Sequence, residues 1–150
     1  MSREERTGWR DREYSKRHRL YGRDCPALDV DFLEYDRGKV VALVECKHRH
    51  ARRQDLSHPT YRALIDLGDR AEVPVLLARH AEDFSWWIVT PLNDLAKNFV
   101  PEKTVLTEKG WVTLLYHVRG RELPGRLLFD DGGKLIQADA PEREMKWLEG

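Results

Sequence analysis

Apolar and polar residues alternate along the first 90 residues in a pattern that predicts helices and strands in the order helix, strand, strand, helix, strand, strand. The predicted elements are a helix over 3–20, strands over 27–36 and 39–48, a helix opened by Ser57 and Pro59 that ends between Gly68 and Ala71, and strands over 73–80 and 85–89. The run over 73–80 is almost wholly apolar, as expected for a strand buried on both faces. This order of elements predicts an α/β fold.

The pattern beyond residue 90 is less regular and predicts a small extension packed on the core. Asn93 is expected to cap a short helix that runs through Lys97. An apolar stripe spaced i, i+3, i+4 and i+7 predicts a helix over 108–119. A hairpin about Asp131-Gly132 and a last helix over 141–149 complete the chain. We therefore expect a core over 1–98 and an extension over 99–150 that serves dimerisation or substrate recognition.

Length and composition predict one soluble domain. The chain has 150 residues, of which 41% are hydrophobic and 35% are charged. No segment approaches the ~20 consecutive apolar residues that a membrane helix needs, and the N-terminal residues do not resemble a secretory signal. With Cys25 and Cys46 as its only cysteines, the chain lacks a disulfide framework. We therefore expect no membrane partner and a cytoplasmic location.

The net charge is zero, so a basic isoelectric point cannot argue for nucleic-acid binding. The basic residues are nevertheless clustered in 1–23 and in the segment KHRHARR over 47–53. Such local patches suit a protein that contacts a polyanion on one face, although solvated surface explains them equally well. The residues expected to contact a nucleic-acid backbone are Arg10, Arg17, Arg49, Arg52 and Arg53.

The segment over 29–47 contains the residues with the clearest chemical meaning. Glu45 and Lys47 end an otherwise apolar strand and share one face of it. Asp29 and Asp31 lie on the predicted antiparallel partner. A three- or five-residue connection between the paired ends would place one of these aspartates opposite Glu45, whereas a two-residue turn would place Val30 there.

Simple alternation also assigns the apolar residues of the strand over 39–48 to its two faces. One face is expected to hold Val41 and Leu43 together with Glu45 and Lys47. The opposite, core-facing side is expected to hold Val40, Ala42, Val44 and Cys46.

Carboxylates that converge beside a lysine form a site for a hard cation. Mg²⁺ prefers oxygen ligands, keeps several waters, and typically takes one or two carboxylates together with substrate phosphate oxygens. Lys47 would then lie beside a water and a phosphate, where it could orient the water, help to deprotonate it, or neutralise developing charge.

Asp31 followed by Glu45-x-Lys47 in this hairpin resembles the motif of the PD-(D/E)xK nuclease superfamily, and most closely its archaeal Holliday junction resolvase-like branch. The likeness extends over roughly residues 3–92. It implies a restriction-endonuclease-like αββαββ core with a mixed four-stranded sheet flanked by helices. It also implies hydrolysis of DNA phosphodiesters, including junction or branched DNA, with Mg²⁺ as cofactor and Mn²⁺ as a substitute.

The resemblance assigns roles to the residues of the motif. Asp31, Glu45 and Lys47 would be the catalytic set, with both carboxylates and the backbone carbonyl of Cys46 as metal ligands. Asp31 is preferred to Asp29 because its spacing and the apolar residues after it fit the pattern better, and Asp29 is kept as a further candidate ligand.

Other parts of the family pattern match more loosely. Resolvase-like members use a glutamate from the first helix, for which Glu13 is the candidate because it is expected to point inward with Trp9, Lys16 and Leu20. Some branches follow the lysine with a glutamine and a tyrosine, and Gln54 and Tyr61 are present at different spacing. The leading proline of the pattern is not adjacent, Pro26 being the nearest.

Several alternatives remain open at this point. Glu45 and Lys47 could form a cross-strand salt bridge at a sheet end. Asp29 could be a strand-edge residue or a residue that supports the metal ligands, and Glu13 could pair with Arg17 at i,i+4. The chain as a whole could be a non-catalytic nucleic-acid-binding or interaction module on the same fold. It could also be a nuclease subunit that acts only within a larger complex, whereas a resolvase-like enzyme would be a homodimer that cuts two strands.

Overall fold

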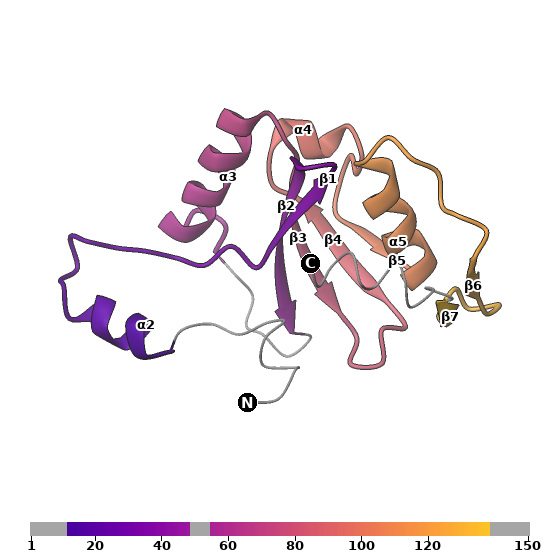
Figure 1. Cartoon of the computed structure of the whole chain (residues 1–150), viewed down its shortest axis with the longest axis horizontal. Coiled ribbons are helices and arrows are strands. Elements are labelled where there is room, and N and C mark those ends of the chain that lie inside the picture. Colours follow the sequence, from indigo (N-terminus) through magenta and orange to yellow (C-terminus); the bar gives the residue numbers. More distant parts are fainter. Residues whose placement is uncertain (1–11, 49–54, 139–150) are drawn as a thin grey trace.

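The computed structural model describes residues 12–48 and 55–138, and it confirms an α/β protein (Figure 1). Its elements in chain order are α2 (Arg12–Arg19), β1 (Phe32–Asp36), β2 (Lys39–His48), α3 (Pro59–Ala71), β3 (Val75–His80), β4 (Trp87–Pro91), α4 (Asp94–Lys97), β5 (Thr104–Leu106), α5 (Glu108–His117), β6 (Leu127–Phe129) and β7 (Leu135–Ala138). The helices and strands predicted in 59–138 are all found, with small shifts at their ends.

The main sheet is mixed and has five strands in the order β1-β2-β3-β4-β5. Strands β2 and β3 are parallel and are connected through α3, whereas the other neighbours are antiparallel. The expected count of four strands is wrong because β5, with three residues, is too short to show an alternating pattern in the sequence. Strands β6 and β7 form a separate two-stranded sheet.

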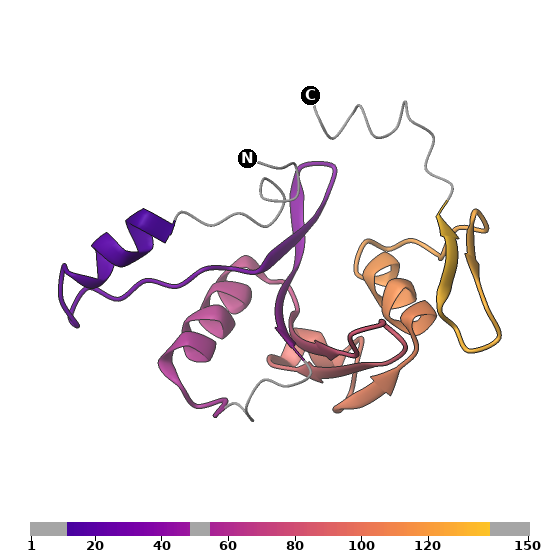
Figure 2. The same cartoon turned by 90° about the horizontal axis from the view of Figure 1, so that it is seen from below.

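Hydrophobic clusters cover both faces of the main sheet, and α3 and α5 lie on opposite sides of it (Figure 2). On one face Leu64 of α3 packs with Leu43, Val73 and Val75. The other face is covered by α4 and α5, and its buried residues are Val44, Leu76, Ala78, Trp87, Val89, Ala96, Val100, Trp111 and Leu114. Burial on both faces explains why β3 is apolar from Val75 to Ala78.

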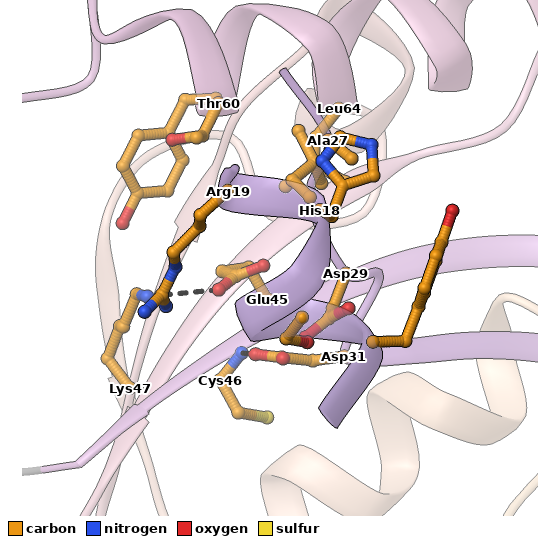
Figure 3. Close-up of a pocket in the computed structure, with 14 residues that line it drawn as sticks. His18, Arg19, Ala27, Asp29, Asp31, Glu45, Cys46, Lys47, Thr60 and Leu64 are labelled. Carbon is orange, nitrogen blue, oxygen red and sulfur yellow. Dashed lines mark hydrogen bonds and ion pairs between the residues drawn. The ribbon is translucent and has the colours of Figure 1, made fainter. Parts of the chain in front are cut away.

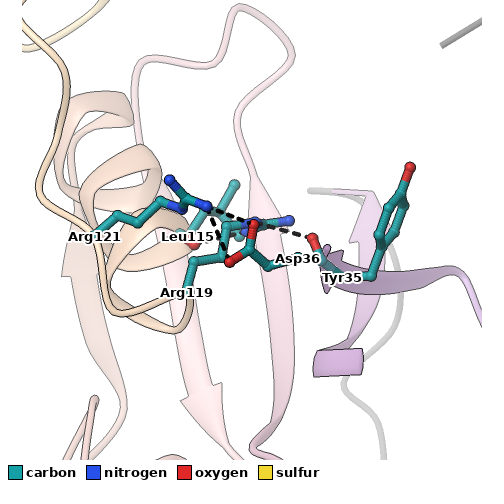
Figure 4. A network of polar contacts seen from close by, with 5 residues as sticks. All are labelled: Tyr35, Asp36, Leu115, Arg119 and Arg121. Carbon is teal, nitrogen blue, oxygen red and sulfur yellow. Dashed lines mark hydrogen bonds and ion pairs between the residues drawn. The ribbon is translucent and has the colours of Figure 1, made fainter. Parts of the chain in front are cut away.

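Residues beyond 98 contribute directly to this core. Trp111 of α5 stacks on Trp87 of β4, with ring centroids 4.8 Å apart and planes inclined by 8°. At the end of α5, Arg119 donates to the carbonyl oxygen of Tyr35 at 3.2 Å, and Arg121 forms a salt bridge with Asp36 at 3.0 Å (Figure 4). The segment after α5 is thereby attached to β1, the edge strand that leads into the hairpin.

The β1–β2 hairpin has a two-residue turn, the connection that by itself would place Val30 opposite Glu45. Arg37 and Gly38 both have positive φ, 52° and 77°, as a type I′ turn requires. A bulge then leaves Val41 without a partner, because Tyr35 pairs with Val40 but Glu34 pairs with Ala42. The extra residue shifts the register by one.

The bulge restores the arrangement that a plain two-residue turn would have removed. Phe32 pairs with Val44, and the same register continued by one residue places Asp31, not Val30, opposite Glu45. The bulge also changes the faces of β2: Val40 packs with the cluster around Leu43, not on the side of Val44 as strict alternation predicted.

Two N-terminal predictions need correction. The strand expected over 27–36 starts only at Phe32, so Asp29 and Asp31 precede β1 rather than belong to it. The inward stripe expected on the first helix is also wrong, since α2 has no buried residue and Leu20 is 74% exposed. The helix instead turns Ser15 and His18, which are half-buried, toward the rest of the protein. Residues 3–11 of the predicted helix, the loop over 49–54 and the helix over 141–149 lie outside the described residues.

The strands predicted to begin at residues 73 and 85 begin at Val75 and Trp87. Pro74 has no N–H to donate to a sheet, which delays the start of β3. The backbone N–H of Ser85 donates to the side chain of Asp83 at 3.1 Å, so Ser85 belongs to the turn before β4.

Gly68 marks a close approach of α3 to β3. A Cβ at this position would overlap the side chain of Val75 and lie 3.2 Å from the carbonyl oxygen of Val73. We expect Gly68→Ala to lower the free energy of unfolding by roughly 1–3 kcal/mol, despite the better helix propensity of alanine, because the core must shift to accept the methyl group. Urea denaturation measures the change. Gly125→Ala is the control because a Cβ there meets nothing within 4 Å; equal stability of the two variants would contradict the close approach.

Candidate active site

A cavity of about 480 Å³ opens beside the second half of β2. It is bounded by α2, by the segment over 27–31 and by the first turns of α3, so together with β2 four segments of the chain form it (Figure 3). The polar residues of the motif that line it are Asp29, Asp31, Glu45, Cys46 and Lys47. The structure thus brings together the residues that the sequence singled out in 29–47.

Asp31 is held against β2 by its own side chain. Its Oδ2 accepts a hydrogen bond from the backbone N–H of Cys46 at 2.9 Å. The carboxylate therefore takes the place that a backbone carbonyl would have if β1 continued. The side chain of Cys46 packs against the core on the opposite face of the sheet, which leaves its backbone available to the cavity.

Glu45 and Lys47 project from the same face of β2 and form a salt bridge, with Glu45 Oε1 3.0 Å from Lys47 Nζ. The sequence left a cross-strand salt bridge as an alternative, whereas the observed pair joins two residues of one strand and lies within the cavity. The side chains are only 12% and 29% exposed, respectively. A partly buried ion pair beside a further carboxylate is costly to place, so its presence calls for a functional reason.

The ionisation of the pair follows from its surroundings. Burial raises the pKa of Glu45, and the nearby charge of Asp31 raises it further against the opposing effect of Lys47. Burial acts to lower the pKa of Lys47, but the hydrogen bond and charge of Glu45 outweigh it, so that pKa is raised. Lys47 is therefore an ammonium group in this arrangement, which favours charge neutralisation and orientation over proton abstraction.

Tyr61, in the first turn of α3, adds a buried hydroxyl to the same cavity. The residue is 4% exposed, and its hydroxyl has no hydrogen-bond partner in the described part of the chain. Burial raises the pKa of Tyr61, while the positive charges of Lys47 and Arg79 lower it, which places both cations near the phenol. An unsatisfied buried donor at a polar cavity is suited to hold a ligand oxygen.

The donor set can be tested for its fit to Mg²⁺. Within residues 12–48 and 55–138, no group of three His, Cys, Asp or Glu side chains is arranged to hold a metal ion. The carboxylates of Asp31 and Glu45 nevertheless lie close enough for the charge of Asp31 to raise the pKa of Glu45. Because Mg²⁺ typically takes one or two carboxylates and completes its shell with water and substrate oxygens, these two with the Cys46 carbonyl suit it.

Two of the remaining predicted residues, Glu13 and Arg17, do not join this cluster. Glu13 and Arg17 are exposed on α2 and do not line the cavity. The helix contributes Tyr14, Ser15, His18 and Arg19 instead. Arg10, Arg49, Arg52, Arg53 and Gln54 lie outside the described residues.

Sequence reasoning missed Arg79, although a signal for it was present. The strand over 73–80 ends in Arg79-His80 after an apolar run, as the preceding strand ends in Glu45-Cys46-Lys47. In the parallel pair β2–β3, Arg79 is the direct partner of Lys47. Polar residues at the ends of two adjacent parallel strands meet at one edge of a sheet, which is where α/β proteins commonly bind ligands.

The two cysteines offer a direct test of the placement of Cys46. Burial, together with the charges of Asp31 and Glu45, raises the pKa of the Cys46 thiol to about 12, whereas Cys25 is exposed. At pH 8 we expect Ellman's reagent to react quickly with the exposed thiol of Cys25 and slowly with the thiol of Cys46, because the thiolate is the reactive form. Both thiols should react quickly in denaturant, and Cys25→Ser should abolish the fast phase. Rapid reaction of both thiols in the folded protein would show that β2 is placed wrongly.

Comparisons of this chain with protein-family models, with curated proteins and with solved structures found no match. In the described residues, no helix has both the length and the apolar character needed to span a membrane.

Proposed function

We propose that the protein is a Mg²⁺-dependent nuclease that hydrolyses phosphodiester bonds of DNA at the cavity beside β2. The observation that carries this proposal is the convergence of Asp31, Glu45 and Lys47, which depends on the bulge at Val41. Two carboxylates and an ammonium group that share a partly buried cavity match the needs of a metal-assisted attack on a phosphate.

The residues of the cavity have different roles, which follow from their chemistry. Asp31, Glu45 and the backbone carbonyl of Cys46 would hold the Mg²⁺ ion. When bound, that ion supplies a nucleophilic water at neutral pH and stabilises charge on the phosphate. Lys47, held by Glu45 at 3.0 Å, places a positive charge where the phosphate gains negative charge. The Tyr61 hydroxyl donates a hydrogen bond to an oxygen in the cavity and so orients the phosphate.

The first test is a cleavage assay with the purified chain. Linear duplex, single-stranded, flap, splayed-arm and four-way-junction DNA would be incubated with Mg²⁺, with Mn²⁺ or with EDTA. We expect cleavage with either metal, none with EDTA, and recovery when Mg²⁺ is added back in excess. The DNA that is cleaved fastest would identify the preferred substrate structure. If no substrate is cleaved but DNA is still bound, the proposal of a nuclease is wrong for the isolated chain. The protein would then be a binding module or a subunit that needs a larger complex.

A further inference from the structure

A row of residues crosses the sheet from the candidate active site toward its far edge. Lys47 of β2 pairs with Arg79 of β3, Arg79 pairs with Ile88 of β4, and Ile88 pairs with Val105 of β5. Paired residues on adjacent strands project from the same face and lie about 5 Å apart. The row therefore extends the face of Lys47 over four strands.

This row is not covered by the hydrophobic core. Arg79 and Ile88 are half-buried and Val105 is 68% exposed. In the described chain, neither Ile88 nor Val105 belongs to the cluster under α3 or to the cluster under α5. An exposed valine and a half-buried isoleucine beside two cations form an amphipathic strip that begins at Lys47, which lines the cavity.

Arg79 places a second positive charge beside Lys47. Two cations directly opposite each other on adjacent strands repel, and Lys47 and Arg79 are such a pair. Both cations act on the hydroxyl of Tyr61, which lines the cavity, so Arg79 lies at the active-site end of the row. Two adjacent cations at this end of the sheet suit the binding of a polyanion.

We propose that this row binds the nucleic-acid strand on one side of the bond to be cut, with Arg79 holding the phosphate next to the one at Lys47. Ile88 and Val105 then contact the sugar and base of the nucleotides that follow. Arginine suits this task because its planar guanidinium forms paired hydrogen bonds with a phosphate. The inference rests on the proposed nuclease function and adds a substrate-positioning residue to it.

The test compares a polynucleotide with a substrate that has a single phosphate. Arg79→Ala, Arg79→Lys and wild type would be assayed on the preferred DNA of the panel and on a dinucleotide, which has one phosphodiester and no neighbouring phosphate. Arg70→Ala is the matched control, since it removes the same charge from an exposed ion pair with Asp66 on α3. Thermal unfolding of each variant would check that the fold is intact.

We expect Arg79→Ala to lower kcat/KM on DNA by roughly 10- to 100-fold and to reduce the salt dependence of DNA binding by about one phosphate contact. The same variant should lose much less activity on the dinucleotide than on DNA. Arg79→Lys should retain the salt dependence with a smaller loss of kcat/KM, and Arg70→Ala should change neither quantity.

The outcomes separate this inference from the proposed function. If wild type cleaves DNA but Arg79→Ala cleaves and binds it like Arg70→Ala, the proposed nuclease function is retained. The proposal that the row binds the nucleic-acid strand is then wrong. If Arg79→Ala loses as much activity on the dinucleotide as on DNA, Arg79 acts at the reacting phosphate or on the fold, and the neighbouring-phosphate role is wrong. If wild type cleaves neither substrate and binds no DNA, both proposals fall together.

Discussion

Lys47→Ala is expected to reduce Mg²⁺-dependent DNA cleavage by roughly 10²- to 10³-fold, the usual cost of removing one group that stabilises charge in a transition state. The raised pKa of Lys47 keeps the side chain charged, so its contribution is electrostatic. Lys47→Arg keeps the charge but changes the shape of the donor, and we expect it to recover part of the lost rate. Cleavage by Lys47→Ala at the wild-type rate would remove this residue from the mechanism.

Glu45→Gln should abolish metal-dependent cleavage to at least the same extent, because an amide is a poor substitute for a carboxylate ligand of Mg²⁺. Asp31→Asn should behave in the same way. Isothermal titration with Mg²⁺ in the absence of DNA would show whether each variant has lost metal affinity, and circular dichroism would show whether it is folded. Retained metal binding by both variants would contradict the assignment of Asp31 and Glu45 as ligands.

The same Glu45→Gln variant should be at least as stable as wild type when both are kept metal-free with EDTA. The pKa of Glu45 is raised in the folded protein, so folding favours the protonated carboxyl and its ionised form costs stability. At acidic pH, where the carboxyl is protonated in folded and unfolded chains alike, that cost is absent. This loss of stability appears as the pH rises through the pKa of Glu45 in the unfolded chain. It is fully present above the pKa of Glu45 in the folded protein. The gain in Tm from Glu45→Gln should therefore grow with pH over that interval.

A gain in stability combined with a loss of cleavage would distinguish a functional cluster from a structural salt bridge. Residues kept for chemistry commonly lower stability, whereas a salt bridge kept for stability does not. A clear drop in the Tm of Glu45→Gln at neutral pH would mean that the Glu45–Lys47 pair holds the sheet together. The salt-bridge alternative would then be the better account of these residues.

The sequence predicted most of the fold because its strongest signals are local. The apolar periodicity of α3 and α5, the turn residues Arg37-Gly38 and the cap at Asn93 each act within a few residues. The fifth strand could not be predicted in this way, since three residues of β5 gain their partner only from β4. The orientation of α2 was mispredicted because the helix has few apolar residues, and packing against distant segments decides which side turns inward.

The bulge at Val41 shows where local reasoning about the site reaches its limit. The residues Val40 and Val41 fit a regular strand as well as a bulged one, so alternation alone cannot place the extra residue. With the observed two-residue turn, a regular strand would have put Val30 opposite Glu45. Asp31 reaches Glu45 only through the added residue. Asp31, Glu45 and Lys47 could thus be singled out from the sequence, whereas the geometry that brings them together required the tertiary structure.

Asn93→Ala is expected to be the most destabilising single substitution proposed, lowering the free energy of unfolding by roughly 3–5 kcal/mol. The side chain is 5% exposed and makes four hydrogen bonds. Its Oδ1 accepts from the backbone N–H groups of Val75 and Ala96, both at 3.0 Å. Its Nδ2 donates to the carbonyl oxygen of Val73 at 2.9 Å and to Asp69 at 3.1 Å.

These bonds join three elements at one point. Asn93 caps α4, fixes the first residue of β3, and contacts Asp69 near the end of α3. Alanine would leave two backbone N–H groups and one carbonyl without partners in a dry part of the core, and each such group costs about 1–3 kcal/mol. Asn93→Asp would keep the acceptor but lose both donors and place a second carboxylate beside Asp69, so its loss of stability should increase with pH.

Urea denaturation of Asn93→Ala and Thr107→Ala would separate this effect from ordinary helix capping. Thr107 caps α5 with one hydrogen bond, which its Oγ1 accepts from the backbone N–H of Gly110 at 3.1 Å, so its loss should cost about 1 kcal/mol. Equal losses in the two variants would mean that Asn93 acts as a cap alone. A several-fold larger loss for Asn93→Ala would mean that it also fixes the start of β3. Because β3 carries Arg79 and pairs with the strand of Glu45 and Lys47, this amide would then support the candidate site from the opposite end of the sheet.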